Sequence, residues 1–367
     1  MRLIIAGGGT GGHLFPGMAV AEEFLARDPA NQVLFVGTER GIESRAVPAA
    51  GYRLELISAA GVRGKGSLSK LKAGAMMLYG YAQSRTILKE FLPDMVLGVG
   101  GYASLPMVMA ARGMQIPTFI HEQNAIPGMT NKLLARIVNQ VFITLDESAR
   151  YFPEGKTLLT GNPLRRQILE MVERHSSLPA DSSTRAAGEF RLFIFGGSQG
   201  AHALNMAMIE ALPELAKRGV TLDITHQTGE NDFQQVEKAY RAAGLTARVA
   251  PFISDMAAEY ARADMIICRA GATTIAEITA CGKACLFIPF PHAVDDHQRK
   301  NAEALYKMNA CFLLLEPELK GGRLAQSICE LQADPELVRR TGEAARSLAR
   351  LDASKIIVDE MTKPAHL

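Results

Sequence analysis

Short apolar runs alternate with longer stretches of mixed character along almost the whole chain. Valine, isoleucine, leucine and phenylalanine dominate these runs, as they do in buried strands. Besides the opening run from Leu3, we expect strands at residues 32–36, 95–99, 117–120, 140–143, 157–160, 191–195, 222–225, 248–250, 265–268 and 284–288. Helical patterns separate most of them. The alternation predicts an α/β fold with two Rossmann-like, doubly wound domains, each a parallel sheet covered by helices.

The boundary between the two expected domains falls at Gly161-Asn162-Pro163, directly after the strand at 157–160. We expect an N-terminal domain at residues 1–163 and a C-terminal domain at 164–340. The charged stretch 175–189 is predicted to be a surface loop. The pattern over 334–357 is helical, and we expect the last segment, 341–367, to be a helix that packs back on the first domain.

Two glycine-rich turns, about half a chain apart, each follow a strand and open a helix. They read LIIAGGGTGGH at residues 3–13 and LFIFGGSQGAHALN at residues 192–205. Glycine lets an anion approach the backbone closely, and a helix N-terminus offers unpaired N–H groups and partial positive charge. We therefore expect phosphorylated ligands in a cleft between the domains, and the two turns need not bind the same one.

A dinucleotide site is the first alternative for these turns, since Gly7, Gly9 and Gly12 match GxGxxG. That reading also needs an acidic residue at the end of the second strand, where Glu39 comes late. The second turn lacks the pattern, which disfavours this alternative. A P-loop is excluded because no Gly-Lys-Ser/Thr follows either turn.

Composition fits a soluble two-domain protein. The 367 residues are 48% hydrophobic and 21% charged, and the net charge of +2 gives no reason to expect nucleic acid as a partner. The five cysteines form no CxxC pair, so we expect packed thiols in a reducing cytoplasm.

The longest uncharged stretches, 3–21 and 95–111, are broken by glycine and proline. We expect neither a signal peptide nor a membrane span, and at most surface contact with a membrane.

Two polar constellations follow strands of the second half, CRAGATTIAE at 268–277 and PFPHAVDDHQRKNA at 289–302. A carboxylate such as Glu277 could accept both hydroxyls of a ribose, although a helix-surface glutamate is more often only solvated. The second constellation could mimic a metal cluster with His292, Asp295, His297 and Gln298. Its spacing fits no standard zinc site and no DxD pair is present, so hydrogen bonding to a neutral polar ligand is the better interpretation.

His13 stands at the entrance of the first helix, beside the expected anion site. It could cap the helix or contact a phosphate. It could also act as a general base, because histidine titrates near neutral pH.

Seven segments in order resemble the MurG family of bacterial N-acetylglucosaminyltransferases. They are GGGTGGHLFPGMAVA, GVGGYASLP, HEQNAIPGMTNKLLA, GNPLRRQI, GGSQGAHALN, CRAGATTIAEI and HQRKNA. The resemblance implies a GT-B fold and no cofactor or required metal. It implies inverting transfer of N-acetylglucosamine from UDP-N-acetylglucosamine to the C4 hydroxyl of the muramyl sugar of undecaprenyl-pyrophosphoryl lipid I. The product is lipid II, for peptidoglycan synthesis.

The resemblance also assigns roles to residues of this chain. The donor sugar would face Thr10, Gly11, Gly12 and Asn124, and the nucleotide would meet Arg165, Ser198 and Ile253. The diphosphate and sugar would follow Ala272, Thr273, Thr274, Ile275 and Ala276, with Glu277 on the ribose and Gln298 on sugar hydroxyls. His13 and Glu122 would be the catalytic residues near the acceptor, and we take His13 as the base. The second glycine turn and Arg165 would then hold the leaving diphosphate, which leaves the first turn for the acceptor's diphosphate.

A basic, apolar stretch at residues 62–92 suits a membrane surface, which an acceptor with a polyprenyl tail requires. It carries Arg63, Lys65, Lys70, Lys72, Arg85 and Lys89 against Glu90, beside Met76, Met77, Leu78, Tyr79 and Tyr81. Such a helix can lie on an anionic membrane, here the cytoplasmic face of the bacterial inner membrane. The alternative is an ordinary packed helix with a solvated face.

Three other functions stay open on the sequence alone. A UDP-N-acetylglucosamine 2-epimerase has a related two-domain fold and would need carboxylates placed for proton transfer. A GT-B transferase could act on another acceptor, and a UDP-sugar sensor would show no turnover.

Overall fold

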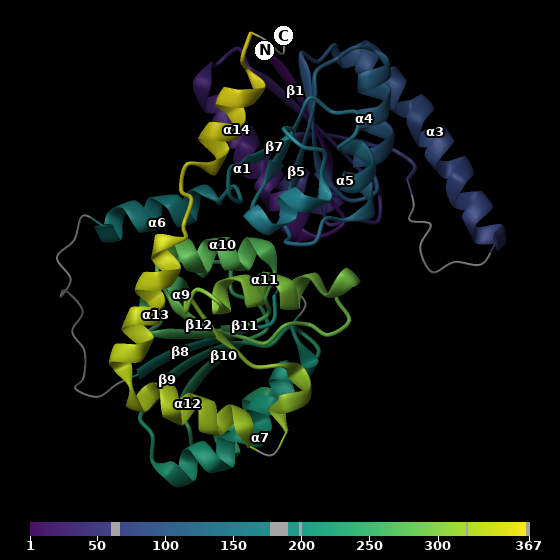
Figure 1. Ribbon diagram of the computed structural model, residues 1–367. Helices are drawn as coiled ribbons and strands as arrows, with labels where there is room; N and C mark the ends of the chain where they lie inside the picture. Colours follow the sequence, from purple (N-terminus) through teal and green to yellow (C-terminus); the bar gives the residue numbers. More distant parts are fainter. Residues whose placement is uncertain (60–66, 177–189, 198–199, 321, 365–367) are drawn as a thin grey trace. The chain divides into compact units, whose positions relative to one another are not determined.

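The computed structural model describes residues 1–59, 67–176, 190–197, 200–320 and 322–364. The chain forms two compact units. The N-terminal unit comprises Met1–Arg165 together with Arg350–Leu367, and the C-terminal unit comprises Arg166–Ala349. Figure 1 shows a parallel sheet flanked by helices in each unit.

The N-terminal unit holds a seven-stranded parallel sheet in the order β3-β2-β1-β4-β5-β6-β7. Its strands are β1 (Arg2–Gly7), β2 (Gln32–Gly37), β3 (Arg53–Leu56), β4 (Met95–Gly100), β5 (Thr118–Glu122), β6 (Gln140–Ile143) and β7 (Thr157–Leu159). Its helices are α1 (Gly11–Arg27), α2 (Glu43–Ala49), α3 (Ser67–Phe91), α4 (Ser104–Gly113), α5 (Met129–Leu134), the 3₁₀ helix η1 (Asp146–Tyr151) and α14 (Ala353–Met361).

Two apolar cores cover the two faces of this sheet. On one face α1 packs with α14, so that Leu14 and Phe24 share a core with Ile357 and Met361 (Figure 1). On the other face the core is built from α3, α4 and α5. Strands buried on both faces read as continuous apolar runs, which is why they stand out in the sequence.

The C-terminal unit holds a six-stranded parallel sheet in the order β10-β9-β8-β11-β12-β13. Its strands are β8 (Phe190–Phe195), β9 (Leu222–Gln227), β10 (Ala247–Ala250), β11 (Met265–Cys268), β12 (Ala284–Phe287) and β13 (Phe312–Leu313). Its helices are α6 (Arg166–Ser176), α7 (His202–Arg218), α8 (Phe233–Ala242), α9 (Met256–Arg262), α10 (Ala272–Cys281), η2 (Val294–Asp296), α11 (His297–Tyr306), η3 (Glu316–Leu319), α12 (Arg323–Ala333) and α13 (Pro335–Ser347). Helices α7 and α12 pack together on one face, while α10 and α13 lie on the other (Figure 1).

The predicted fold class of two doubly wound parallel-sheet domains is confirmed. The helix expected at 334–357 is broken, because α13 ends at Ser347 in the C-terminal unit and α14 begins at Ala353 in the N-terminal unit. The loop expected at 175–189 begins later, since α6 continues to Ser176, and residues 177–189 lie outside the described part of the chain. Strands β3 and β13 were not expected. Both lie at sheet edges. The strand β3 reads RLEL, with charged residues alternating with its leucines, and β13 is only two residues long.

Candidate active site

The carboxyl ends of β1, β4 and β5 carry the polar residues of the N-terminal unit. These strands are neighbours, and the strand order reverses between β1 and β4. Doubly wound sheets bind ligands at such a switch point. Here the first glycine turn follows β1, Gly100 ends β4 and Gln123 follows β5.

The first glycine turn uses two of its N–H groups within the unit. Gly8 donates to the carbonyl oxygen of Gly100 at 3.1 Å, and Gly9 donates to the carboxylate of Glu43 at 2.7 Å. The anion-binding capacity expected for the whole turn therefore falls to the first turn of α1. Thr10 is the N-cap of that helix, and its side chain makes no capping hydrogen bond. An anion could take the place of such a cap.

Glu43 is a buried carboxylate at the first glycine turn that the sequence did not indicate. Its side chain is 1% exposed, and it also accepts hydrogen bonds from the N–H (2.9 Å) and the hydroxyl (3.0 Å) of Thr38. A Cβ atom at Gly8 or at Gly37 would lie 2.3 Å from the Glu43 side chain. Part of the glycine content around this turn therefore makes room for a buried carboxylate.

His13 follows Gly11 and Gly12 at the start of α1 and is half-buried. Its Nδ1 lies 2.8 Å from Oε1 of Gln123. Its ring packs against the backbone of Gly100, where a Cβ atom would lie 2.8 Å from Nδ1. The structure thus joins His13 to Gln123, which the sequence did not single out.

Glu122, a predicted catalytic residue, has a carboxylate whose two oxygens each accept two hydrogen bonds. One oxygen accepts from the backbone N–H (2.9 Å) and side-chain amide (3.2 Å) of Asn124, and the other accepts from the N–H of Gly128 (3.2 Å) and the amide of Asn131 (2.9 Å). The side chain is 1% exposed. In this geometry Glu122 anchors the loop after β5 and positions Asn124.

The second glycine turn follows β8 in the C-terminal unit, and Ser198 lies outside the described residues. Gln227, the last residue of β9, is buried beside it. Its amide donates to the carbonyl oxygen of Gly197 at 3.0 Å and its Oε1 accepts from the N–H of Ile253 at 2.7 Å. The N–H of Ile253 is therefore already engaged, and we assign the nucleotide contact expected for this residue to its carbonyl oxygen.

The helix α10 begins with its N-cap Gly271, without a side-chain cap. The five residues expected along the diphosphate occupy its first turns: Ala272, Thr273, Thr274, Ile275 and Ala276. Glu277, at 2% exposure, is buried rather than solvated, and its carboxylate accepts from the hydroxyl of Tyr260 at 3.1 Å. The small residues at the helix start and the held carboxylate fit a site built around this helix.

Gln298 is the second residue of α11, and its Oε1 accepts from the N–H of Phe290 at 3.0 Å. The segment before it is held by Arg269, which is 9% exposed. This guanidinium donates to the carbonyl oxygen of Ile288 at 3.0 Å and lies 2.5 Å from the carboxylate of Glu316. Arg269 was inside a motif of the sequence, but only the structure shows what it holds.

Arg165 belongs to the N-terminal unit. Its guanidinium carbon lies 5.4 Å from the centroid of the Phe15 ring, a cation–π arrangement. The structure therefore groups Arg165 with α1, and the nucleotide contact expected for it stays a prediction.

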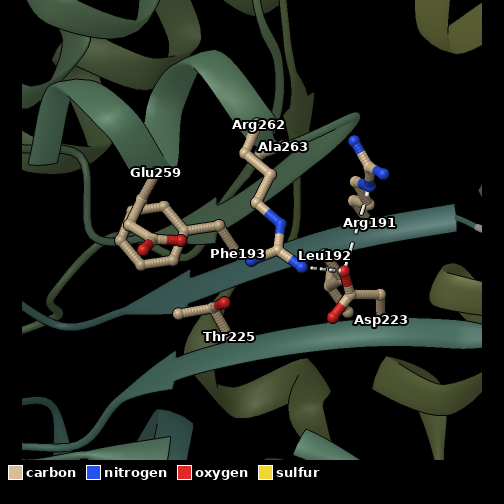
Figure 2. A pocket seen from close by; sticks show the side chains of 8 residues that line it. All are labelled: Arg191, Leu192, Phe193, Asp223, Thr225, Glu259, Arg262 and Ala263. Carbon is tan, nitrogen blue, oxygen red and sulfur yellow. Dashed lines mark hydrogen bonds and ion pairs between the residues drawn. The ribbon is translucent and has the colours of Figure 1, made fainter. Parts of the chain in front are cut away.

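A small pocket lies beside the amino-terminal half of β8, away from the carboxyl ends of the strands. Figure 2 shows Arg262 extending toward Asp223, and dashed lines join the Asp223 carboxylate to both Arg191 and Arg262. The distances of 3.9 Å and 2.5 Å to the Asp223 carboxylate make it an ion-pair cluster between β8, β9 and α9. Among the described residues, no group of three His, Cys, Asp or Glu side chains is placed to hold a metal ion.

Two family models match the chain. The model described as "Glycosyltransferase family 28 N-terminal domain" covers residues 3–143, and "Glycosyltransferase family 28 C-terminal domain" covers residues 191–357. Together with the two doubly wound sheets, they define a glycosyltransferase of the GT-B class.

The family within that class follows from relatives. The UDP-N-acetylglucosamine--N-acetylmuramyl-(pentapeptide) pyrophosphoryl-undecaprenol N-acetylglucosamine transferase of Pelobacter propionicus is 65% identical over 379 aligned residues, which cover all of both proteins. The crystal structure of Acinetobacter baumannii MurG is 32% identical, with a TM-score of 0.78 over 98% of each chain. The chain belongs to the MurG family of N-acetylglucosaminyltransferases.

The fold alone does not separate this family from the epimerases. The crystal structure of UDP-GlcNAc 2-epimerase from Neisseria meningitidis bound to UDP-GlcNAc matches with a TM-score of 0.66, over 98% of this chain and 99% of that one, at 14% identity. That likeness shows a shared architecture, and the sequence identity to the transferases decides the family.

Proposed function

We propose that this chain transfers N-acetylglucosamine from UDP-N-acetylglucosamine to the C4 hydroxyl of the muramyl sugar of lipid I, with inversion and without a metal, and so forms lipid II. The observation that carries the proposal is the 65% identity, over the whole of both chains, to a transferase named for this donor and acceptor. The buried polar residues around both glycine turns support it.

The donor binds the C-terminal unit in this proposal. The first turn of α10 and the second glycine turn, including Ser198, hold the diphosphate, since helix N-termini favour anions. Glu277 holds the ribose, the carbonyl of Ile253 accepts a hydrogen bond from uracil and Gln298 holds sugar hydroxyls.

The Glu277→Ala variant should bind UDP at least about tenfold more weakly in calorimetric titration, because the ribose loses its carboxylate partner. The matched control Glu330→Ala, which changes an exposed glutamate of the same unit, should bind UDP normally. Unchanged affinity of Glu277→Ala would refute the ribose role.

The acceptor and the base belong to the N-terminal unit. The first turn of α1, with Thr10, Gly11 and Gly12, faces the acceptor diphosphate and the transferred sugar, and Asn124 contacts the sugar. His13 takes the proton of the acceptor hydroxyl. Glu122 keeps the loop in place and receives no catalytic role, because its carboxylate already accepts four hydrogen bonds.

A labelled-donor assay tests the proposed reaction. The enzyme is incubated with radiolabelled UDP-N-acetylglucosamine, with and without lipid I in detergent. Label should move to the lipid fraction only when lipid I is present, and His13→Ala should lower the turnover about 10²–10⁴-fold. Conversion of the labelled sugar without an acceptor would indicate an epimerase and overturn the proposal.

We also propose that α3 contacts the cytoplasmic face of the inner membrane, where the acceptor is anchored. Leu78 is 75% exposed and Tyr79 is 61% exposed, which is unusual for large apolar side chains. Arg85 and Lys89 are exposed on the same helix stripe as Leu78, at i+7 and i+11. Arg63 and Lys65 lie outside the described residues. None of the helices in the described part of the chain is both long and apolar enough to cross a bilayer.

Vesicle sedimentation tests the membrane contact. The chain should sediment with anionic vesicles at low salt, and L78E/Y79E should reduce the bound fraction several-fold. The matched control Y306E/M308E changes side chains of similar exposure, 54% and 57%, in the C-terminal unit, and should bind as the unmodified chain does. Equal binding of both double variants would contradict the role of α3.

A further inference from the structure

A continuous hydrogen-bonded chain runs from the start of α1 to the end of the N-terminal sheet. His13 Nδ1 lies 2.8 Å from Gln123 Oε1, Gln123 Nε2 lies 3.0 Å from His121 Nδ1, and His121 Nε2 lies 3.1 Å from the carbonyl oxygen of Gly161. Gln123 Nε2 also lies 3.0 Å from the carbonyl oxygen of Val99. His121 and Gln123 are each 1% exposed, so bulk water does not compete for these contacts.

The far end of this chain fixes the protonation of His121. A carbonyl oxygen can only accept, so His121 Nε2 carries the proton that is donated to Gly161. Burial lowers the pKa of His121 to about 4, which keeps the ring neutral at neutral pH. Its Nδ1 therefore bears a lone pair and accepts from Gln123.

The middle of the chain fixes the orientation of the Gln123 amide. Its NH₂ group must face the Val99 carbonyl and the bare Nδ1 of His121, because both are acceptors. The flipped amide would place its oxygen against these two acceptors in a buried site, which is strongly unfavourable. The Oε1 atom consequently faces His13, and an amide oxygen can only accept.

We propose that Gln123, held by His121, is a positioning residue that keeps neutral His13 in the tautomer with the proton on Nδ1 and the lone pair on Nε2. This inference rests on the proposed role of His13 as the base. It extends that role by naming the atom that receives the proton and the residues that prepare it. A buried carboxylate performs this task in hydrolase triads, and here a neutral amide and a neutral imidazole perform it.

The proton and electron balance of the step is simple. The O–H bond of the acceptor hydroxyl breaks as its proton moves to Nε2 of His13. The hydroxyl oxygen forms a bond to the anomeric carbon, and the bond from that carbon to the UDP oxygen breaks, with the electron pair leaving on UDP. Gln123 Oε1 accepts from Nδ1–H before and after this transfer, so the network needs no rearrangement.

The tautomer can be measured directly on the unmodified enzyme. The full chain is labelled with ¹⁵N-histidine, and two-bond ¹H–¹⁵N spectra are recorded at alkaline pH. The signals of His13 are assigned by their loss in His13→Gln. The expected pattern is a protonated Nδ1 and a bare Nε2 for His13. The opposite tautomer, or a mixture of the two, would overturn the proposal without bearing on the transferase activity itself.

Kinetics of Gln123→Met test the consequence for the reaction. This near-isosteric change removes the acceptor for Nδ1–H, so kcat should fall between about tenfold and 10³-fold while the KM for UDP-N-acetylglucosamine changes less than about threefold. His13 in this variant should show a mixture of tautomers. An unchanged kcat in a folded Gln123→Met enzyme would overturn the proposal.

Two further variants separate positioning from general support of the fold. His121→Gln can still donate to Gly161 and accept from Gln123, so it should retain turnover within about threefold, and a loss as large as that of Gln123→Met would contradict the relay. Gln227→Met, an equally buried glutamine of the C-terminal unit, should raise the KM for the donor instead of lowering kcat. The two proposals can also fail separately. If the unmodified enzyme showed the expected His13 tautomer while His13→Ala kept its turnover, the assignment of His13 as the base would be wrong, but Gln123 would still position the ring.

Discussion

At the scale of single residues, buried polar side chains organise the site. Glu43, Glu122, Gln227 and Arg269 are all less than one tenth exposed and hold loops at the strand ends. Removing one partner from such a contact leaves a buried donor or acceptor without a partner, which costs more than the hydrogen bond itself contributed. The residues that prepare this site therefore also contribute to its stability.

Glu43→Gln tests this coupling. The amide can replace only one carboxylate oxygen, so either the Gly9 or the Thr38 N–H loses its acceptor. We expect the free energy of unfolding to fall by about 1–3 kcal/mol in urea titration. Glu55→Gln, on an exposed strand position, should change it by less than about 0.5 kcal/mol. Equal effects of the two variants would argue against a structural role for the buried carboxylate.

The buried histidines predict a pH dependence of stability. Burial lowers the pKa of His121 from 6.5 to about 4 and that of His226 to about 3. The unfolded chain then binds protons that the folded chain does not, so full stability holds above pH 6.5 and is lost as the pH falls toward these values. In that range each buried histidine should lower the free energy of unfolding by about 1.4 kcal/mol for every unit by which the pH falls. Unfolding titrations at pH 7.5 and 5 should show a smaller loss for His121→Gln, and an identical loss would contradict this assignment.

At the scale of elements, the sequence predicted most of the strands and helices, which are continuous segments of the chain. It predicted few of the contacts between residues that are far apart in the chain. Central strands were visible because burial on both faces demands uninterrupted apolar residues. The edge strand β3 has one half-buried residue, Leu54, among exposed ones and carried no such signal. The partners of the glycine turns were also hidden, since Glu43 is 34 residues from Gly9 and Gln123 is 110 residues from His13. The motifs located both glycine turns, and the packing of the unit determined what each one contacts.

Gly100→Ala tests the contact between the end of β4 and His13 on helix α1. Gly100 has a φ of +99°, and a Cβ atom there would lie 2.8 Å from His13 Nδ1. Gly51 has a similar φ of +82° with nothing within 4 Å of a Cβ atom, so Gly51→Ala carries the backbone strain alone. Both should lose about 1–2 kcal/mol of stability from strain, and only Gly100→Ala should also lose at least about tenfold in kcat. Equal kcat values in the two variants would show that the His13 ring tolerates the displacement.

At the scale of the whole molecule, the chain leaves its first unit at Arg165 and returns to it at Arg350. The returning helix α14 completes the core beneath α1, the helix that carries His13, with Ile357 at 0% and Val358 at 1% exposure. The sequence indicated this return, but it predicted one helix where the structure has two, because the break at residues 348–352 lacks a proline or glycine signal.

Ile357→Ala tests the importance of this return. The loss of a fully buried side chain should lower the stability of the N-terminal unit by about 2–5 kcal/mol. The exposed neighbour Lys355→Ala should be close to neutral. Hydrogen exchange read separately for the two units should show the change in residues 1–165 and not in residues 166–349. Uniform loss of protection in both units would contradict the assignment of α14 to the first core.

The central claim, an inverting transfer between two substrates, is tested most directly by the product itself. The enzyme is supplied with UDP-N-acetylglucosamine, whose sugar is α-linked, and with lipid I, and the anomeric proton of the new linkage is examined by NMR. We expect a β-linked disaccharide on the lipid, formed only in the presence of both substrates. An α-linked product, or epimerised sugar without lipid I, would contradict the account.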